Sequence, residues 1–298
     1  AVGKTSLPQL AAVLSQCRLL LTNDTGPMHL AVGAGTPVID LSVGHVDFRE
    51  TGPYGPGHWM VQPDLGCAPC GFDKVCFHHA CKDRLVPEQI ASLCLHVLAG
   101  AAFPQSITGA RIYRSYADED GLGSTQLHAG REDSVIEWYG RFWRRFWFEE
   151  FTGRASQVPA HAEPAPDWAE ALAVLEHLAP LAKKLVAKAE ELVRLTTRHP
   201  LPISALQQLQ RDETSERQQI LALSMNTPAT ASLAVAMVRD THNDDGSELT
   251  ELAQSRLGTY RRWHKRLQAV ASRFRSFNRA QGLVRRGGSR PLPMVRSA

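Results

Sequence analysis

The stretch NDTGPMHLAVGAGTPVID, from Asn23 to Asp40, decides the fold. It follows the apolar run RLLLT (18–22), which is typical of a buried parallel strand, and it leads into PVIDLS (37–42), which predicts the next strand. Between them, PMHLAVGAG (27–35) predicts a short helix with proline at its first position. An acid, a hydroxyl and a glycine therefore fill the turn between the end of a strand and the start of a helix.

The segment just before this stretch completes a repeating pattern. SLPQLAAVLSQC (6–17) predicts a helix, with Ser6 as its N-cap and Pro8 in its first turn. Helix, strand, helix and strand joined by short connections are typical of a doubly wound α/β sheet. In such sheets, ligands bind beyond the carboxyl ends of the strands.

The chemistry of the DTG turn indicates a ligand that carries both a diphosphate and a sugar. Free N–H groups at a helix N-terminus attract phosphate, Gly26 lets the backbone approach it, and Thr25 adds a hydroxyl. His29 lies one helical turn further along. Asp24 would repel phosphate, so it is better suited to accept hydrogen bonds from sugar hydroxyls.

Composition and charge add two constraints. The chain has 298 residues, 43% of them hydrophobic, which is enough for a real core. The first 100 residues carry 6 Lys and Arg against 8 Asp and Glu, so the remaining residues carry 27 against 22. After Glu251 there are twelve basic residues and no acid, a pattern that favours anionic partners. Because the chain opens on AVGK without Met, we expect it to be incomplete.

The pattern along the chain suggests three regions. Residues 1–100 form an α/β domain, residues 101–165 a mixed linking region, and residues 166–298 a mostly helical extension that ends in a basic helix. The Pro- and Ala-rich stretch VPAHAEPAPD (158–167) is a candidate linker.

Several motifs in order give the first region a resemblance. TSLPQLAAVLSQCRLLLTNDTGPMHLAVGAGTPVIDL, TGPYGPGH and the cysteine-bearing segment resemble glycosyltransferase family 9, the ADP-heptose:lipopolysaccharide heptosyltransferases, over residues 3–98. The resemblance implies a partial GT-B Rossmann-like C-terminal domain that binds a nucleotide sugar. It also implies a set of donor-binding residues: Lys4, Thr5, Asp24, Thr25, Gly26, Pro27, Met28 and His29.

The resemblance further implies an activity. Such enzymes transfer a heptose-like sugar, with inversion, from an ADP-sugar to a lipopolysaccharide or glycan acceptor, and they need no cofactor and no metal. The general base belongs to the N-terminal domain, which we expect to precede this segment, so no catalytic residue is assigned and the 298-residue chain is expected to be inactive alone. If it does turn over, Asp47 and Glu50 are the first candidates for the base. The implied location is cytoplasmic, with peripheral contact at the inner face of the cytoplasmic membrane.

Two features compete with this interpretation. SVGHVDFRE (42–50) departs at Val43, Gly44 and His45 from the G-P-T that the family carries after the second strand, so the resemblance does not predict how phosphate is contacted there. GKTS (3–6) is compatible with the end of a P-loop, although the family resemblance explains it more simply.

The cysteine segment offers an alternative function. Cys67, Cys70, Cys76 and Cys81 have a spacing similar to a small zinc knuckle, but the second C-x2-C pair is absent, so we expect reduced or paired cysteines and no metal. The alternative to an enzyme is a nucleic-acid-binding or metal-knuckle interaction protein built on this segment and the basic tail. Acidic residues at 212–216 and 244–251 argue against a continuous nucleic-acid face.

The helical extension gives weaker signals. Leucines between 175 and 192 form a stripe that predicts a packing face. From Tyr260 to Phe277 large apolar residues step by 3, 4, 3, 4 and 3, with arginines and lysines on the other faces. This basic amphipathic helix packs on its neighbours, contacts an anionic membrane or binds nucleic acid. The aromatic run at 138–147 is expected to be core.

Overall fold

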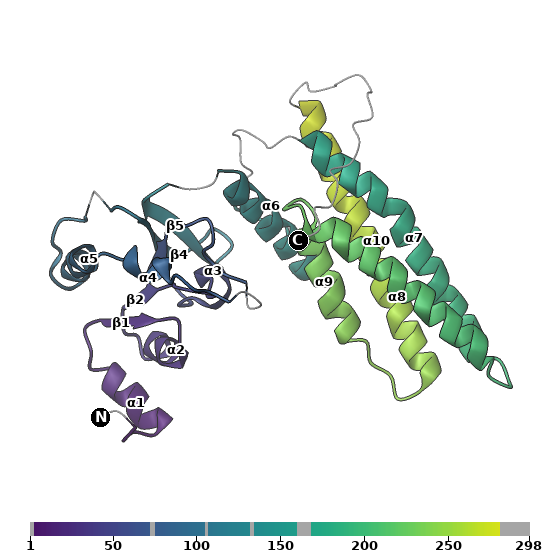
Figure 1. The fold of residues 1–298 in the computed structure, drawn as a ribbon, viewed down its shortest axis with the longest axis horizontal. Helices are drawn as coiled ribbons and strands as arrows, with labels where there is room; N and C mark the ends of the chain where they lie inside the picture. Colours follow the sequence, from purple (N-terminus) through teal and green to yellow (C-terminus); the bar gives the residue numbers. More distant parts are fainter. Residues whose placement is uncertain (1–2, 72–74, 105–106, 132–133, 160–167, 281–298) are drawn as a thin grey trace. The chain divides into compact units, whose positions relative to one another are not determined.

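The computed structural model describes the chain except for residues 1–2, 72–74, 105–106, 132–133, 160–167 and 281–298 (Figure 1). The chain divides into two compact units. One comprises residues 1–134 and 145–160, and the other comprises residues 135–144 and 161–298. The first is an α/β unit and the second is helical.

The α/β unit is built on a five-stranded sheet in the order β1-β2-β3-β4-β5. The strands are β1 (Leu20–Asn23), β2 (Val38–Leu41), β3 (Trp59–Pro63), β4 (Ala110–Ala117) and β5 (Gly123–Ala129). The first three run parallel, while β4 is antiparallel to β3 and β5 is antiparallel to β4. The α/β class predicted from the sequence is confirmed, with a Rossmann-like parallel part.

Local sequence explains the first elements. Helix α1 (Leu7–Leu14) begins with a capping box in which Ser6 and Gln9 exchange side-chain and backbone hydrogen bonds. Helix α2 (Gly26–Gly33) has proline in its first turn, where a missing N–H costs nothing. All four elements predicted between residues 6 and 42 are present, with boundaries within three residues.

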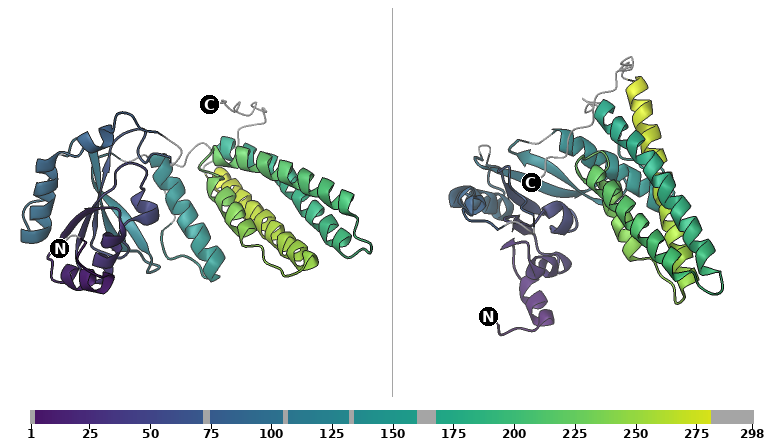
Figure 2. Two further views of the ribbon diagram at one scale, coloured as in Figure 1. Left: turned by 60° about the horizontal axis from the view of Figure 1, so that its bottom comes forward. Right: turned by 45° about the vertical axis from the view of Figure 1, so that its right-hand side comes forward.

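Helices cover both faces of the sheet (Figures 1 and 2). On one face, Met28 of α2 packs with Val38 of β2, and Phe48 of the short helix α3 (Phe48–Thr51) packs with Met60 and Tyr113. On the other face lies α5 (Pro87–Ala99), whose buried residues join a cluster with the other side of β2, β3 and β4. The one-turn helix α4 (Ala80–Asp83) precedes α5.

The sheet continues past residue 100. Strands β4 and β5 form a hairpin that pairs with β3 through Trp59↔Arg114 and Met60↔Tyr113. The part of the chain expected to be a linking region therefore contributes two strands and the buried residues Ile112 and Tyr113 to the α/β unit. The candidate linker at 158–167 falls mostly outside the described residues.

The second unit consists of long helices. They are α7 (Trp168–Thr196), α8 (Ile203–Met225), α9 (Ala231–His242) and α10 (Leu249–Ala280), together with residues 135–144 of α6 (Ser134–Thr152). Helices α7 and α10 pack side by side along much of their length (Figure 2). The helical pattern predicted after residue 167 is confirmed.

The apolar stripe of α10 faces inward. Tyr260, Trp263 and Phe274 are each at most 1% exposed, and the Trp263 indole Nε1–H donates to the Leu233 carbonyl at 3.0 Å. Leu178 and Leu185 of α7 have no exposed surface, as the leucine stripe predicts. Of the alternatives for the basic helix, the burial of its aromatic side chains agrees with packing on neighbouring helices.

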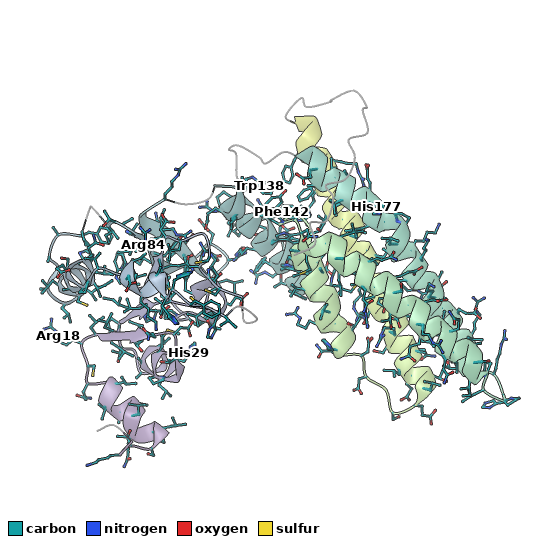
Figure 3. The ribbon with its side chains drawn as sticks, viewed as in Figure 1. Arg18, His29, Arg84, Trp138, Phe142 and His177 are labelled. Atoms are coloured by element: carbon teal, nitrogen blue, oxygen red, sulfur yellow. The ribbon has the colours of Figure 1, made fainter. Side chains whose placement is uncertain are left out.

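The first half of α6 joins the same core. The Phe142 ring lies 4.8 Å from Phe274, and Trp138 lies 5.9 Å from Phe277, between ring centres (Figure 3). Trp143 donates its indole N–H to the Pro228 carbonyl at 2.8 Å. The aromatic run is core as expected, although Trp147 is only partly buried.

A buried polar network links α8 to α10. Glu213 is 8% exposed and accepts hydrogen bonds from Tyr260 and Arg256, and Arg256 also pairs with Asp244. Burial, followed by the nearby Glu213 carboxylate, raises the pKa of Tyr260. Because each buried charge has a partner, the network links the helices without leaving an isolated charge.

Within the described residues, no helix combines the length and the apolar character needed to cross a membrane.

Substituting Trp263→Ala should destabilise the helical unit by about 3–5 kcal/mol, because it removes a large buried side chain and its hydrogen bond. Lys265→Ala, two residues along and exposed, is the control and should change stability by less than about 0.5 kcal/mol. Urea unfolding followed by circular dichroism measures both. A loss below about 1 kcal/mol for Trp263→Ala would contradict the inward packing of the stripe.

Candidate functional site

The start of α2 presents backbone N–H groups at the carboxyl edge of the sheet. β1 ends at Asn23, and Thr25 is the N-cap of α2 with an extended backbone but no side-chain cap hydrogen bond. Its hydroxyl instead donates to the Asn23 carbonyl at 3.1 Å. The first turn of α2 is therefore not capped by a side chain, as suits a site for an anionic ligand.

Gly26 stands where an approaching ligand needs space. A Cβ placed on this residue would meet no atom within 4 Å, and its φ is not positive. The fold alone therefore does not require glycine at this position. The absence of a side chain leaves the first-turn backbone open to a ligand, which is the role expected from the motif.

Asp24 is held in place by the second crossover. The Thr51 hydroxyl of α3 donates to Asp24 Oδ2 at 2.5 Å. Helix α3 is itself fixed at its start, where the Asp47 carboxylate accepts from the Arg49 N–H at 3.0 Å. The Asp24 side chain is half-buried and keeps a second oxygen for another partner.

A second carboxyl group lies close to Asp24. Asp40 of β2 has no exposed surface, and its Oδ2 accepts a hydrogen bond of 2.5 Å from the Ser42 hydroxyl. Its Oδ1 is buried and has no hydrogen-bond partner in the described part of the chain. Asp40 shares a face of the sheet with Val38, beneath α2, because side chains two apart on a strand point the same way.

The surroundings of Asp40 favour its protonated form. Burial raises the pKa of Asp40 to about 6; the Ser42 hydrogen bond opposes this rise, and the nearby Asp24 carboxylate adds to it. Near neutral pH the site thus holds two acids of different character, of which Asp24 is reachable and Asp40 is enclosed. Sequence reasoning missed Asp40, although one acid inside the apolar strand VIDL is an available signal.

Because of Asp40, the free energy of unfolding should decrease as pH rises. Its folded pKa of about 6 lies above the ordinary 3.8, so its favourable contribution is complete below about pH 4 and is lost as pH rises through 6. The difference is worth at most about 3 kcal/mol. Asp40→Asn, which keeps a polar group for Ser42, should therefore raise the melting temperature at pH 7.5 but not at pH 4.

Melting curves from pH 4 to pH 8 test this, with the exposed Asp83→Asn as control. Parallel curves for wild type and Asp40→Asn across that range would contradict the assignment.

The other donor-binding candidates occupy different surroundings. His29 is exposed on α2, one turn beyond Gly26 (Figure 3), and Pro27 lies in the first turn. Met28 has no exposed surface and packs in the core with Val38, so it secures the helix. Its place among the donor-binding residues stays a prediction.

Lys4 and Thr5 lie just before α1. Neither forms a hydrogen bond or an ion pair with any residue in the described ranges. They are available to a ligand, but within the described ranges no hydrogen bond or ion pair joins them to the DTG turn.

The cysteine segment is tied to the loop after β2. The Cys70 N–H donates to the Gly44 carbonyl at 2.8 Å, and Gly44 has a φ of +75°, which suits glycine. The VGH sequence (43–45), which differs from the family's G-P-T, thus connects the carboxyl edge of the sheet to the cysteines. Burial, and then the Cys67, Cys76 and Cys81 thiols, raise the pKa of Cys70.

All six cysteines are free thiols: Cys17, Cys67, Cys70, Cys76, Cys81 and Cys94. In the described ranges, no group of three or more His, Cys, Asp or Glu side chains is placed to hold a metal ion. The four thiols of the segment are thus near one another without forming a coordination shell there. The apolar patterns around Cys17 and Cys94 predict that both are core residues; Cys17 is instead exposed, while Cys94 is partly buried against the cluster that includes α5.

A parallel sheet with an uncapped helix start and an acidic turn at its carboxyl edge is the arrangement of a Rossmann-like ligand-binding domain. The sequence model of glycosyltransferase family 9 (heptosyltransferase) matches residues 1–80. This segment is therefore similar to glycosyltransferase family 9, which is the resemblance that the motifs predict.

Curated relatives agree. The chain is 33% identical over 99 residues to lipooligosaccharide heptosyltransferase 2 of Campylobacter jejuni subsp. jejuni serotype O:2, covering 32% of this chain and 30% of the relative. It is 50% identical over 52 residues to lipopolysaccharide core heptosyltransferase OpsX of Haemophilus influenzae, covering 17% and 15%. The chain thus spans less than a third of the length of these relatives. No solved structure matches it.

Proposed function

We propose that the α/β unit binds the nucleotide-sugar donor of a heptosyltransferase-like glycosyltransferase. The donor would be an ADP-sugar such as ADP-heptose, and the acceptor a hydroxyl of lipopolysaccharide or another glycan. The observation that carries the proposal is the Asp24 turn, held by Thr51 in front of the uncapped start of α2, inside the segment that matches family 9.

The roles follow from the chemistry of each group. The first-turn N–H groups of α2, with Gly26 leaving space, would bind the diphosphate and stabilise the negative charge that grows on it as the glycosidic bond breaks. Asp24 would accept hydrogen bonds from sugar hydroxyls and so orient the anomeric carbon. His29 lies on the helix face one turn beyond the diphosphate, and Lys4 and Thr5 are proposed to lie near the nucleoside.

Inverting transfer also needs a base that removes the proton of the acceptor hydroxyl. Of the first candidates within the chain, Asp47 is engaged as the N-cap of α3 and pairs with Arg49 at 3.7 Å. Its carboxylate is thus committed to the helix. No residue of the chain is assigned as the base.

The separate roles proposed for Asp24 and for the start of α2 can be tested by measuring ligand binding. Asp24→Ala should weaken binding of an ADP-sugar about tenfold or more, because a carboxylate that accepts hydrogen bonds from the sugar is lost. Binding of ADP alone should stay the same or improve, since the change removes a negative charge near the phosphates. Isothermal titration calorimetry measures both ligands.

Asp83→Asn, an exposed acid on α4, is the matched control and should bind both ligands like wild type. An equal loss of affinity for ADP and for the ADP-sugar in Asp24→Ala would place the residue at the phosphates. Unchanged affinity for both ligands would show that Asp24 is not part of the site.

A peripheral contact with an anionic membrane surface, at the inner face of the cytoplasmic membrane, is a second part of the proposal. It rests on the exposed basic residues of α10, among them Arg262, Lys265 and Arg275. Because Trp263 is buried, the contact would be electrostatic, without insertion of aromatic side chains.

Wild type should bind phosphatidylglycerol vesicles weakly at low salt, with each engaged basic residue contributing about 1 kcal/mol. Arg262→Gln/Lys265→Gln should lower binding about threefold or more, whereas Lys183→Gln/Lys184→Gln on α7 should have less effect. Co-sedimentation at low and physiological salt measures this, because charges are screened beyond about 8 Å at the higher salt. Equal binding by the two double variants would contradict a contact through α10.

A further inference from the structure

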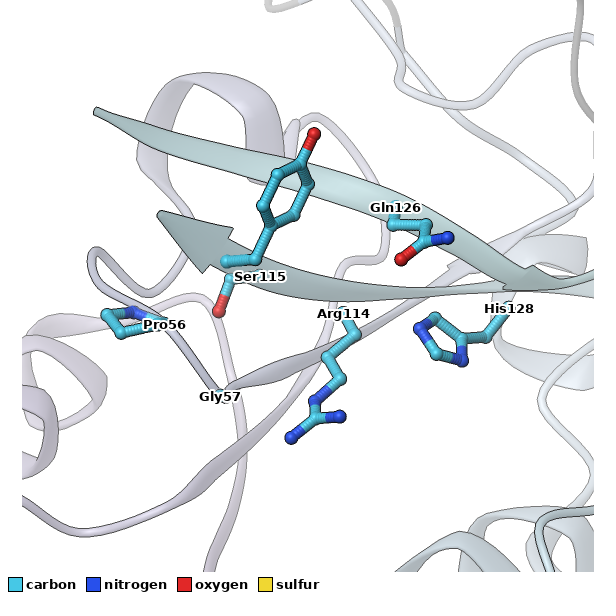
Figure 4. Close-up of a pocket in the computed structure, with 7 residues that line it drawn as sticks. Pro56, Gly57, Arg114, Ser115, Gln126 and His128 are labelled. Carbon is cyan, nitrogen blue, oxygen red and sulfur yellow. The ribbon is translucent and has the colours of Figure 1, made fainter. Parts of the chain in front are cut away.

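A hollow lies in the α/β unit, at the opposite edge of the sheet from Asp24. It has a volume of about 390 Å³ and is formed by the β4–β5 hairpin and the loop that enters β3 (Figure 4). Pro56 and Gly57 of this loop precede the start of β3 at Trp59, whereas the Asp24 turn follows the carboxyl end of β1. The hairpin lies outside residues 1–80, which match the family model.

Backbone hydrogen bonds fix one wall of the hollow. The Gly57 N–H donates to the Ser115 carbonyl at 2.8 Å, and the Ser115 N–H donates to the His58 carbonyl at 2.8 Å. The Ser115 hydroxyl also accepts from the His58 N–H at 2.9 Å. The loop is thereby paired with β4, so the hollow is part of the ordered sheet.

Arg114 supplies charge that the protein itself does not neutralise. In the described part of the chain its guanidinium makes no ion pair and no hydrogen bond, and its contact is with the Trp59 ring, 5.4 Å from the ring centre. Trp59 is 4% exposed and packs against Phe103, His96 and His128. The indole therefore gives the arginine a fixed surface to lie on, with its donors turned toward the hollow.

The rest of the lining is neutral and polar. Burial, then the Arg114 and His96 charges, lower the pKa of His128, so its imidazole is uncharged at neutral pH and has one donor and one acceptor. Gln126 adds an amide, and Tyr116 adds a ring that is 42% exposed. Arg114 and His128 extend into the same open space (Figure 4). Among the described residues that line the hollow, Arg114 alone carries a full charge.

We propose that this hollow binds an anionic sugar, a sugar-sized molecule with one phosphate or carboxylate group. The guanidinium of Arg114 pairs with the anion through parallel N–H donors. Gln126 and His128 exchange hydrogen bonds with hydroxyl groups, and the Tyr116 ring covers the apolar face of the sugar. The site is separate from the donor site at Asp24 and is independent of the function proposed for it.

Titration of the full chain by ligand-observed NMR tests the proposal with four probes: glucose 6-phosphate, glucuronate, glucose and inorganic phosphate. We expect the two anionic sugars to bind in the millimolar range or tighter, and glucose and inorganic phosphate to bind at least about tenfold more weakly, because each lacks half of the contacts. Inorganic phosphate binding as tightly as glucose 6-phosphate would overturn recognition of the sugar.

Arg114→Gln should lower the affinity for both anionic sugars about tenfold or more. Arg131→Gln, an exposed arginine just beyond β5, is the matched control and should leave it unchanged. Far-UV circular dichroism confirms that both variants fold. Retained binding in Arg114→Gln would overturn the site. Displacement of glucose 6-phosphate by excess ADP would also overturn it, because that result would place the sugar at the donor turn.

Discussion

The packing of α2 against β2 is the constraint on which the candidate site depends. Met28 and Ala31 of the helix and Val38 of the strand have no exposed surface, and together they fix where the helix begins. A short helix without such contacts has no fixed place in the fold, whereas one anchored through its first and second turns holds its N-terminal N–H groups in one place. The DTG turn depends on this apolar contact, because the buried residues of α2 and β2 hold Asp24 and Gly26 in position.

Near α2, the fold places two carboxyl groups close together in different surroundings. Asp24 is partly accessible and is held by Thr51, while Asp40 lies beneath in a setting that favours its neutral form. Two ionised acids at this distance would repel each other and would also repel a phosphate. Because burial raises the pKa of Asp40 to about 6, Asp40 is protonated below that pH, which reduces the repulsion there without removing the acid that faces the sugar.

Much of the first unit could be predicted because local signals agree with the tertiary structure. Ser6 caps a helix, Pro27 begins one, and the apolar runs around residues 20 and 39 form parallel strands. Other features depend on distant partners. The hairpin at 110–129 was missed because its strands alternate imperfectly: Ile112 and Tyr113 are both buried, at a bulge in the pairing with β5. Similarly, nothing local to Asp24 indicates that Thr51, 27 residues away, is its partner. The burial of Met28 likewise follows from packing, which a motif does not report.

The two edge strands of the sheet differ in the features that discourage pairing with a further strand. In the described part of the chain, β5 is one edge strand and carries the polar run Ser124, Thr125 and Gln126. Its partner strand β4 has a bulge, and both features discourage the addition of a further strand. β1 closes the other side with LLTN, and Leu21 there is 44% exposed. Within the described strands, β5 therefore has features that resist pairing with a further strand, whereas β1 combines a short strand with a partly exposed leucine and has no such feature.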